Sequence, residues 1–359
     1  MTLATADGTA RYRARFKTLP DSHFRSIAGR TVSSLGAGTY LGREDDATDE
    51  RYVEALAAAV RGGINVLDTA INYRIERSEK AVGRALATLV AGGIGREEVV
   101  VATKGGYIPS RDPAAYVKAL VDAGVITPKE VAAGVHCIAP EYIRHQLRQS
   151  LANLGLDGVD VYYLHNPEQQ LEEVDRREFL RRMRLAFEAL EAHVAAGRVG
   201  VYGTATWTGY RVARGSPGWL SLEGLVQLAR DVAGDGHHFR VVQAPLNLAM
   251  TEAYGDPTQV ANGVEVALLD AAQALDIALV TSAPLLQGRL SRGLPAELQS
   301  AFPSLSTDAQ RAVQFARSCP GVVTTLVGMS RVEHVKEALA LAAVPPATGD
   351  QVRSLFSAG

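Results

Sequence analysis

Short apolar runs alternate with amphipathic helical patterns along most of the chain, and this alternation limits the folds that the sequence can adopt. We count eight apolar runs of strand length, each followed by a segment that predicts a helix. Near-continuous apolar runs are typical of parallel strands buried on both faces. The predicted strands end near residues 42, 68, 104, 165, 203, 245, 282 and 327, and the predicted helices span 51–61, 79–90, 141–154, 176–196, 222–233, 264–275, 308–317 and 332–342.

Two architectures alternate strands and helices in this way, namely a doubly wound sheet and a (β/α)8 barrel. The polar residues favour the barrel, because a barrel carries its working residues at the carboxyl ends of several different strands. Asp68, Lys104 and His165 occupy such positions. We therefore expect one α/β domain, a (β/α)8 TIM barrel over residues 31–345. A flexible or surface-draped N-terminal extension (1–30) would precede it, and a C-terminal tail (346–359) would follow.

The glycine-rich turn near the first predicted strand only partly matches a dinucleotide fingerprint. Gly36, Gly38 and Gly42 have the spacing G-x-G-x-x-x-G, and no ribose-binding acid follows a second strand at the expected distance. A Rossmann domain is therefore the weaker interpretation of this turn.

Charge, hydropathy and cysteine content narrow the choice of partner and compartment. The formal net charge of −2 provides no general attraction to nucleic acid or anionic lipid. No apolar run reaches the length of a membrane span, and the first residues lack the apolar core of a signal peptide. Cys137 and Cys319 predict buried thiols rather than a disulfide framework or a metal motif. We expect a cytoplasmic protein with no nucleic-acid or membrane partner.

Four ionisable side chains are expected to meet at the barrel mouth: Asp68, Tyr73, Lys104 and His165. A lysine ammonium beside the tyrosine would lower the tyrosine pKa, and an aspartate would hold that lysine in place. A neutral histidine could orient a carbonyl oxygen. Such a site suits protonation of this oxygen while a hydride reaches the carbonyl carbon, and the hydride implies a nicotinamide cofactor. Taken singly, each group also has a purely structural interpretation, such as a helix N-cap for the aspartate.

Six sequence motifs follow one another along the chain, namely Gly63–Tyr73, Ala102–Lys104, Ser150–Asp160, Leu164–Pro167, Ser282–Leu290 and Leu326–Val335. Together they resemble the signatures of the aldo-keto reductase superfamily, and the resemblance runs in order from about residue 31 to residue 342. It implies a (β/α)8 barrel that binds NADPH, or less often NADH, without a Rossmann domain. It also implies an oxidoreductase that acts on a small carbonyl or alcohol substrate.

The resemblance also assigns roles to individual residues. It makes Tyr73 the general acid, with Lys104 and Asp68 as its tuning pair, and His165 the group that orients the carbonyl. Arg331 would favour the 2′-phosphate of NADPH. The expected substrate pocket consists of Tyr40, Tyr107, Asn166 and Trp207. The expected cofactor contacts are Gly38, Thr39, Tyr40, Asp68, Thr206, Gln243, Ser282, Pro284, Leu285, Gln287, Gly288, Leu290, Gly328, Ser330, Arg331 and His334.

The chain departs from the usual pattern of this superfamily in five ways, and most of these departures affect contacts with the cofactor. The departures are Ala205–Thr206 in place of Ser-Asn, Leu246 in place of a stacking aromatic residue, His334 in place of arginine, Ala338 in place of asparagine, and the absence of a glycine between Tyr73 and Ser78.

The segment from Gly105 to Pro140 is longer than a usual connection between a strand and a helix. Its helical run, Ala114–Ala123, is consistent with a lid over the substrate pocket and equally with a surface decoration or subunit contact.

Three classes of function remain to be compared. The first is an NADPH-dependent reductase of aldehydes or ketones, or the reverse dehydrogenation of an alcohol or sugar. The second is a nucleotide-sensing regulatory subunit with little turnover. A metal-dependent barrel hydrolase lacks support, because no His-x-His follows the first strand. Substrate identity, direction and oligomeric state are left open by the sequence.

Overall fold

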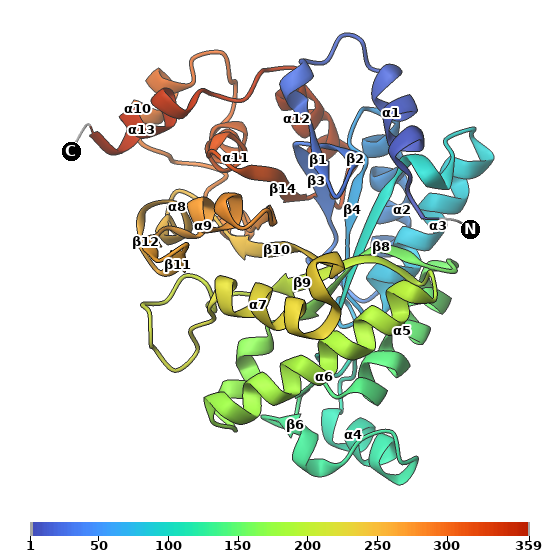
Figure 1. Ribbon diagram of the computed structural model, residues 1–359. Helices are drawn as coiled ribbons and strands as arrows, with labels where there is room; N and C mark the ends of the chain where they lie inside the picture. The colour runs from blue at the N-terminus through green and yellow to red at the C-terminus, as the bar shows by residue number, and fades with distance from the viewer. Residues whose placement is uncertain (1–2, 358–359) are drawn as a thin grey trace.

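A computed structural model, which describes residues 3–357, confirms the predicted barrel (Figure 1). The barrel is closed, its strands follow one another in chain order, and every neighbouring pair is parallel. The barrel strands are β3 (Leu35–Gly38), β4 (Val66–Asp68), β5 (Val100–Gly105), β8 (Val159–His165), β9 (Val199–Ala205), β10 (Phe239–Pro245), β13 (Ala278–Ser282) and β14 (Val322–Gly328).

Amphipathic helices surround the barrel, and their buried faces form one hydrophobic cluster with the outward-facing strand residues. Helix α5 begins with a proline at its first turn and ends at Gly155, which adopts a left-handed conformation. No helix within residues 3–357 has the length and apolar character needed to cross a membrane. The helices are α2 (Asp46–Arg61), α3 (Arg77–Ala91), α5 (Pro140–Leu154), α6 (Arg176–Ala195), α7 (Leu222–Ala233), α9 (Leu268–Ala274), α11 (Asp308–Ser318) and α12 (Val332–Ala342).

The N-terminal segment is ordered and closes one end of the barrel, so the flexible alternative for this extension is wrong. Helix α1 (Ala6–Ala14) leads into a hairpin of β1 (Phe24–Ile27) and β2 (Arg30–Ser33). Ile27 and Val32 belong to the hydrophobic cluster that fills the barrel interior, and their burial orders the hairpin. The proposed boundary at residue 31 therefore falls within a hairpin. Residues 1, 2, 358 and 359 of the two predicted terminal segments lie outside the described residues.

Two predicted elements are divided differently in the structure. The first predicted strand contains β2 of the hairpin and the separate barrel strand β3. The helix predicted over 264–275 begins with a strand, β12 (Val264–Val266), which pairs with β11 (Gln259–Ala261). Asn262 and Gly263 both have positive φ, as an Asn-Gly hairpin turn requires, and this turn outweighs the helical pattern.

The segment after β5 contains α4 (Pro113–Asp122), β6 (Val131–Ala132) and β7 (His136–Cys137). Figure 1 shows α4 and β6 beyond α6, at the lower edge of the molecule. The remaining short elements are α8 (Glu252–Gly255), α10 (Ala296–Ala301), the terminal helix α13 (Gly349–Ser357) and 3-10 turns at Asp21–His23, Arg96–Glu98, Pro128–Glu130, Pro167–Glu172, Gly234–Gly236 and Leu286–Gly288.

The closure of the barrel predicts a measurable loss of stability in acid. The Nε2 atom of His23 lies 3.0 Å from the Gly63 carbonyl oxygen, and burial lowers the pKa of His23 to about 4. In the unfolded chain His23 becomes protonated near pH 6.5, whereas in the folded chain it stays neutral down to about pH 4. The free energy of unfolding therefore falls as the pH decreases from 6.5 toward 4. Between pH 7 and pH 5, we expect the free energy of unfolding to fall by about 2 kcal/mol less in His23→Gln than in the wild-type protein. Urea unfolding of both proteins at the two pH values tests this, and equal pH dependence would contradict it.

Candidate active site

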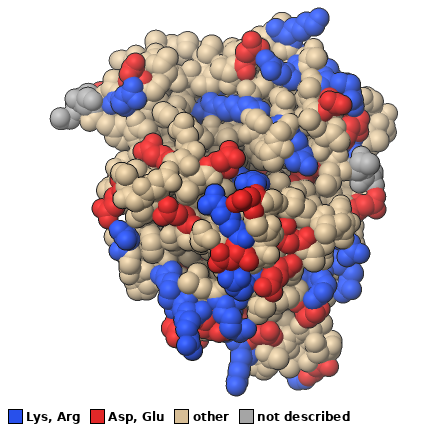
Figure 2. Space-filling view, in the orientation of Figure 1, with Lys and Arg blue, Asp and Glu red and all other residues tan. Residues whose placement is uncertain are grey.

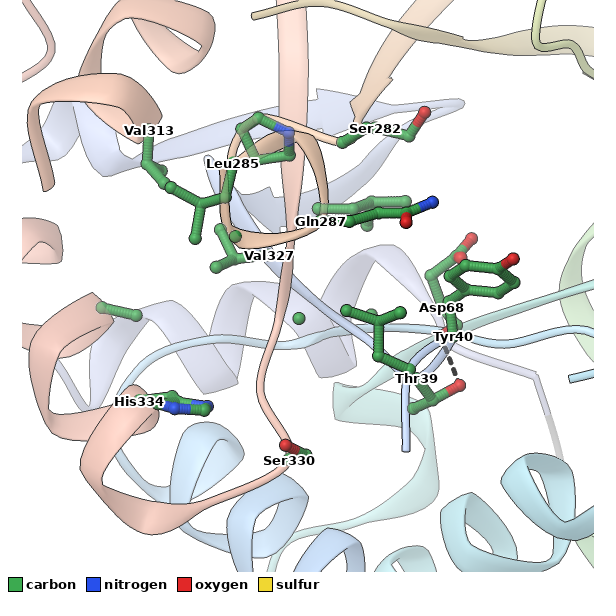
Figure 3. Close-up of a pocket in the computed structure, with 18 of the residues that line it drawn as sticks. Thr39, Tyr40, Asp68, Ser282, Leu285, Gln287, Val313, Val327, Ser330 and His334 are labelled. Carbon is green, nitrogen blue, oxygen red and sulfur yellow. Dashed lines mark hydrogen bonds between the residues drawn. The ribbon is translucent and has the colours of Figure 1, made fainter. Parts of the chain in front are cut away.

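The carboxyl ends of the barrel strands surround a cavity of about 1120 Å³. Figure 3 shows Tyr40 and Asp68 in one part of this cavity and Ser330 and His334 in another. Most residues that the sequence predicts for the site line this single cavity. They are Gly38, Thr39, Tyr40, Asp68, Tyr73, Tyr107, His165, Asn166, Thr206, Trp207, Gln243, Ser282, Pro284, Leu285, Gln287, Gly288, Gly328, Ser330 and His334.

Three predicted residues do not line the cavity. Lys104 is fully buried behind Asp68. Leu290, in the loop after β13, is not among the residues that line the cavity. Arg331 is exposed at the start of α12. Leu246, which the sequence comparison places where a stacking aromatic residue was expected, is fully buried and does not line the cavity.

Lys104 and Asp68 form a buried ion pair at the ends of β5 and β4. Lys104 also donates to the Thr69 carbonyl oxygen at 2.9 Å, and Gln243 donates to the second carboxylate oxygen of Asp68 at 3.0 Å. Burial raises the pKa of Asp68, and the Lys104 ammonium opposes this effect. Burial by itself lowers the pKa of Lys104, but the charges of Asp68 and Tyr73 reverse this, so Lys104 stays protonated at neutral pH.

The ring of Tyr73 lies next to this ion pair, with its centroid 4.9 Å from the Lys104 ammonium nitrogen. Burial raises the pKa of Tyr73, and Lys104 offsets this only in part. Lys104 lowers this pKa as expected, but removal of the hydroxyl from water has the larger effect, so the pKa of Tyr73 stays above its ordinary value. Tyr73 consequently stays protonated at neutral pH.

His165 faces Tyr73 across the cavity, with ring centroids 5.7 Å apart in an edge-to-face arrangement. Burial, together with the charge of Lys104, lowers the pKa of His165 well below its usual range, so the imidazole is neutral as expected. Its Nδ1 atom is buried and has no hydrogen-bond partner among the described residues.

The turn after Tyr73 shows how the chain accommodates the missing glycine. Arg74, Ile75 and Glu76 all adopt left-handed backbone conformations, with φ of 52°, 51° and 66°. Such conformations cost about 1–2 kcal/mol per residue. Arg74 stabilises the turn: its Nε donates to the Arg43 carbonyl oxygen at 2.8 Å, and its guanidinium forms an ion pair with Asp49. The surrounding contacts therefore hold the backbone next to Tyr73 in a strained form.

Glu168 is a buried carboxylate that the sequence did not single out. One of its oxygens accepts backbone N–H groups from Trp207 and Thr208 at 3.0 Å and from Gly209 at 3.2 Å. These contacts fix the loop after β9 and hold Trp207 at the cavity. Since the partners are backbone groups, no sequence motif records them.

The start of α11 also lines the cavity and was not predicted to do so. Thr307 caps this helix, and Gln310 completes a capping box, which is the one sequence signal that marks the position. Thr307 also donates to Glu337 of α12, which connects the two helices at this end of the cavity.

The fold and the site together define a (β/α)8 barrel with a buried Lys-Asp pair, a tyrosine and a neutral histidine at the carboxyl ends of its strands. The chain belongs to the aldo/keto reductase family, whose model matches residues 34–300. This family assignment confirms the resemblance seen in the motifs.

Individual relatives match smaller parts of the chain. It is 31% identical over 140 residues to the NADH-specific methylglyoxal reductase of Escherichia coli (strain K12), covering 38% of each protein. It is 32% identical over 181 residues to the D-threo-aldose 1-dehydrogenase of Pseudomonas sp, covering 50% of this chain and 51% of the relative. The chain thus spans between 38% and 51% of the length of these two relatives.

Solved structures support the fold over nearly the whole chain. An aldo/keto reductase from Klebsiella pneumoniae in complex with NADP and acetate aligns with a TM-score of 0.63 and 23% identity, covering 94% of this chain and 95% of that chain. The glycerol dehydrogenase of Gluconobacter oxydans aligns with a TM-score of 0.66 and 18% identity over the same shares. At these identities the likeness establishes the fold alone.

Proposed function

We propose that this protein is an NADPH-dependent oxidoreductase that reduces an aldehyde or ketone to an alcohol, or catalyses the reverse dehydrogenation of an alcohol or sugar. The observation that carries this proposal is the contact chain from Asp68 through Lys104 to Tyr73, with neutral His165 opposite, at one barrel mouth. Relatives named as a methylglyoxal reductase and an aldose dehydrogenase support both directions of the reaction.

The residues present fit a nicotinamide dinucleotide. Besides His165, the cavity-lining residues Asn72 and Thr206 each have a buried side-chain oxygen, Oδ1 and Oγ1 respectively, without a hydrogen-bond partner among the described residues. Unpaired buried polar atoms cost stability, which favours a ligand that pairs with them. Thr206 and Gln243 would hold the nicotinamide end, and Ser330 and His334 the adenosine end. A structure of a similar fold contains NADP.

The side chains then have distinct tasks. When bound, the dinucleotide supplies the hydride. The Tyr73 hydroxyl donates its proton to the carbonyl oxygen of the substrate, and the Lys104 ammonium stabilises the tyrosinate that remains. Asp68 keeps Lys104 charged and in place. His165, which is neutral, hydrogen-bonds to the same carbonyl oxygen and orients it toward Tyr73.

The surroundings of the site fit a small-molecule partner. Tyr40 and Trp207 are partly exposed aromatic side chains at the cavity, and Tyr107 and Asn166 hydrogen-bond to each other beside them at 3.1 Å. Figure 2 shows positive and negative side chains interspersed on the face in view. Both cysteines are free and buried, which supports a reducing, cytoplasmic location.

Fluorescence titration with NADPH and NADH, followed by a screen of aldehydes and ketones, tests the proposal. Micromolar binding of either dinucleotide and consumption of reduced cofactor by a carbonyl compound are the expected results. Binding without turnover would favour the regulatory alternative, and absence of binding would overturn the proposed function.

Arg331 provides a separate prediction about cofactor preference. Arg331 is exposed and immediately precedes α12. Its guanidinium can turn toward the 2′-phosphate of an NADPH bound next to Ser330. We expect Arg331→Ala to weaken NADPH binding by about tenfold while NADH binding changes by less than about twofold, since only NADPH carries the additional charge. Lys336→Ala removes an exposed cation from the same helix and serves as the control. An equal loss of binding affinity for NADPH and NADH would show that Arg331 does not contact the 2′-phosphate.

A further inference from the structure

His136 is a fully buried histidine that the proposed mechanism does not use. It lies on β7, in the segment inserted between β5 and α5, and its Nε2 atom is 2.7 Å from the carbonyl oxygen of His165. The ring of Tyr107 lies edge-on to both histidines, with centroid distances of 5.0 Å to His136 and 5.1 Å to His165. The insertion therefore reaches the backbone of the site directly.

The close approach between His136 and His165 depends on the chain next to them. The backbone N–H of Cys137 donates to the Gly106 carbonyl oxygen at 2.9 Å, which aligns β7 with the end of β5. Gly106 has a φ of 137°, and a Cβ at this position would lie 2.7 Å from His136 Nε2 and 3.1 Å from the His165 carbonyl oxygen. The glycine leaves room for the hydrogen bond.

The hydrogen-bond partners of His136 determine which ring nitrogen carries the proton. Arg182 has only donors, and its Nη1 lies 2.5 Å from Gln170 Oε1, so the amide oxygen of Gln170 faces the arginine. The amide nitrogen of Gln170 then faces His136 and lies 2.8 Å from Nδ1. Because this nitrogen donates, Nδ1 must accept, and the ring proton is on Nε2. His136 therefore donates to the carbonyl oxygen of His165.

The surroundings keep His136 in one protonation state. Burial lowers the pKa of His136 to about 4, and no carboxylate contacts the ring among the described residues. The imidazole therefore carries a single proton across the physiological range, and the direction of its hydrogen bond to His165 does not change with pH in that range.

We propose that His136 is a positioning residue for His165, fixed in its Nε2–H tautomer by Gln170 and Arg182. By hydrogen-bonding to the carbonyl oxygen of His165, it fixes the backbone there and so the orientation of the His165 imidazole relative to Tyr73. A mechanism that needs His165 to orient a carbonyl oxygen needs this direction to be constant. The inference rests on the proposed function and assigns a role to the inserted segment, which supplies the positioning residue.

The tautomer is tested by NMR without any turnover. Long-range ¹H–¹⁵N correlation of histidine-labelled protein at pH 7 is expected to show His136 neutral and protonated on Nε2. In Gln170→Glu, a carboxylate faces Nδ1, so we expect His136 to become a doubly protonated imidazolium at the same pH. A wild-type ring protonated on Nδ1 would overturn the proposal.

Kinetics test the consequence for His165. We expect His136→Leu to lower kcat by about 10- to 100-fold, with the dinucleotide Kd within about twofold of the wild-type value. His136→Gln retains an N–H donor and should recover kcat to within about fivefold. The control is His23→Leu, since His23 is another buried histidine that bonds to a backbone carbonyl, at the opposite end of the barrel. It should lose stability without losing kcat.

The possible outcomes separate the two proposals. An equal fall in kcat in the His23 control, or no recovery in His136→Gln, would reduce His136 to a structural role. Absence of any wild-type turnover would overturn the proposed function instead. A crystal structure of His136→Leu then decides the positioning role, because an unchanged orientation of His165 would overturn it.

Discussion

Tyr73→Phe is expected to lower kcat for a carbonyl substrate by about 10²- to 10⁴-fold, the range over which a positioned general acid contributes. The change removes only the hydroxyl. The ring can keep its edge-to-face contacts with Tyr40 and His165 and its position beside Lys104. Dinucleotide binding should therefore stay within about twofold of the wild-type value. Steady-state kinetics and fluorescence titration of the same preparation measure both quantities.

Tyr12→Phe is the matched control for this experiment. Tyr12 is also buried, and its hydroxyl donates to the Val60 carbonyl oxygen at 2.5 Å, near the closed end of the barrel. Its loss should reduce the free energy of unfolding by about 1 kcal/mol and leave kcat unchanged. If Tyr73→Phe kept more than about a tenth of the wild-type kcat, the proton would come from another group and the assigned role of Tyr73 would be wrong.

Lys104→Met is expected to cost about 3–5 kcal/mol of folding free energy and to abolish most turnover. The variant leaves the Asp68 carboxylate buried, with Gln243 as its remaining side-chain donor in the structure. It also removes the cation that stabilises a tyrosinate. Urea unfolding at pH 7 measures the first effect, and kcat under conditions where the variant is folded measures the second.

Two companion variants separate the ion pair from the chemistry. Arg96 and Asp160 form another buried ion pair, with a distance of 2.8 Å, on the closed side of the barrel. Arg96→Met should destabilise the protein comparably and leave kcat of the folded protein unchanged. Adding Asp68→Asn to Lys104→Met should restore part of the stability, because a neutral amide is less costly to bury, but should not restore kcat. Stability unchanged in Lys104→Met would mean that the pair contributes no net free energy.

Local sequence patterns predict the barrel well because its strands and helices each bury one continuous apolar surface. Helix α6 begins at the predicted residue and ends within one residue of the predicted end. The N-terminal hairpin was missed for a physical reason. Ile27 and Val32 become ordered by burial among barrel residues far away in the chain, and no local period records such a contact.

The candidate site also contains some features that the sequence predicts and others that depend on the assembled fold. Polar residues at strand ends can be read from the sequence, and barrel closure brings Asp68, Tyr73 and His165 to one cavity. His136 and Glu168 act on backbone groups, which every residue has, so their partners leave no pattern in the sequence. The direction of the Tyr73 pKa shift depends on burial, which is a property of the assembled fold.

The left-handed turn after Tyr73 also bears on how this protein can change by mutation. Ile75 is β-branched and has a φ of 51°, a conformation that glycine or asparagine adopts at much lower cost. Substitution at this one position therefore offers a short route to a more stable protein. Such a substitution would also let the chain beside Tyr73 relax. Selection for thermal tolerance would then act on a residue only two positions from the proposed general acid.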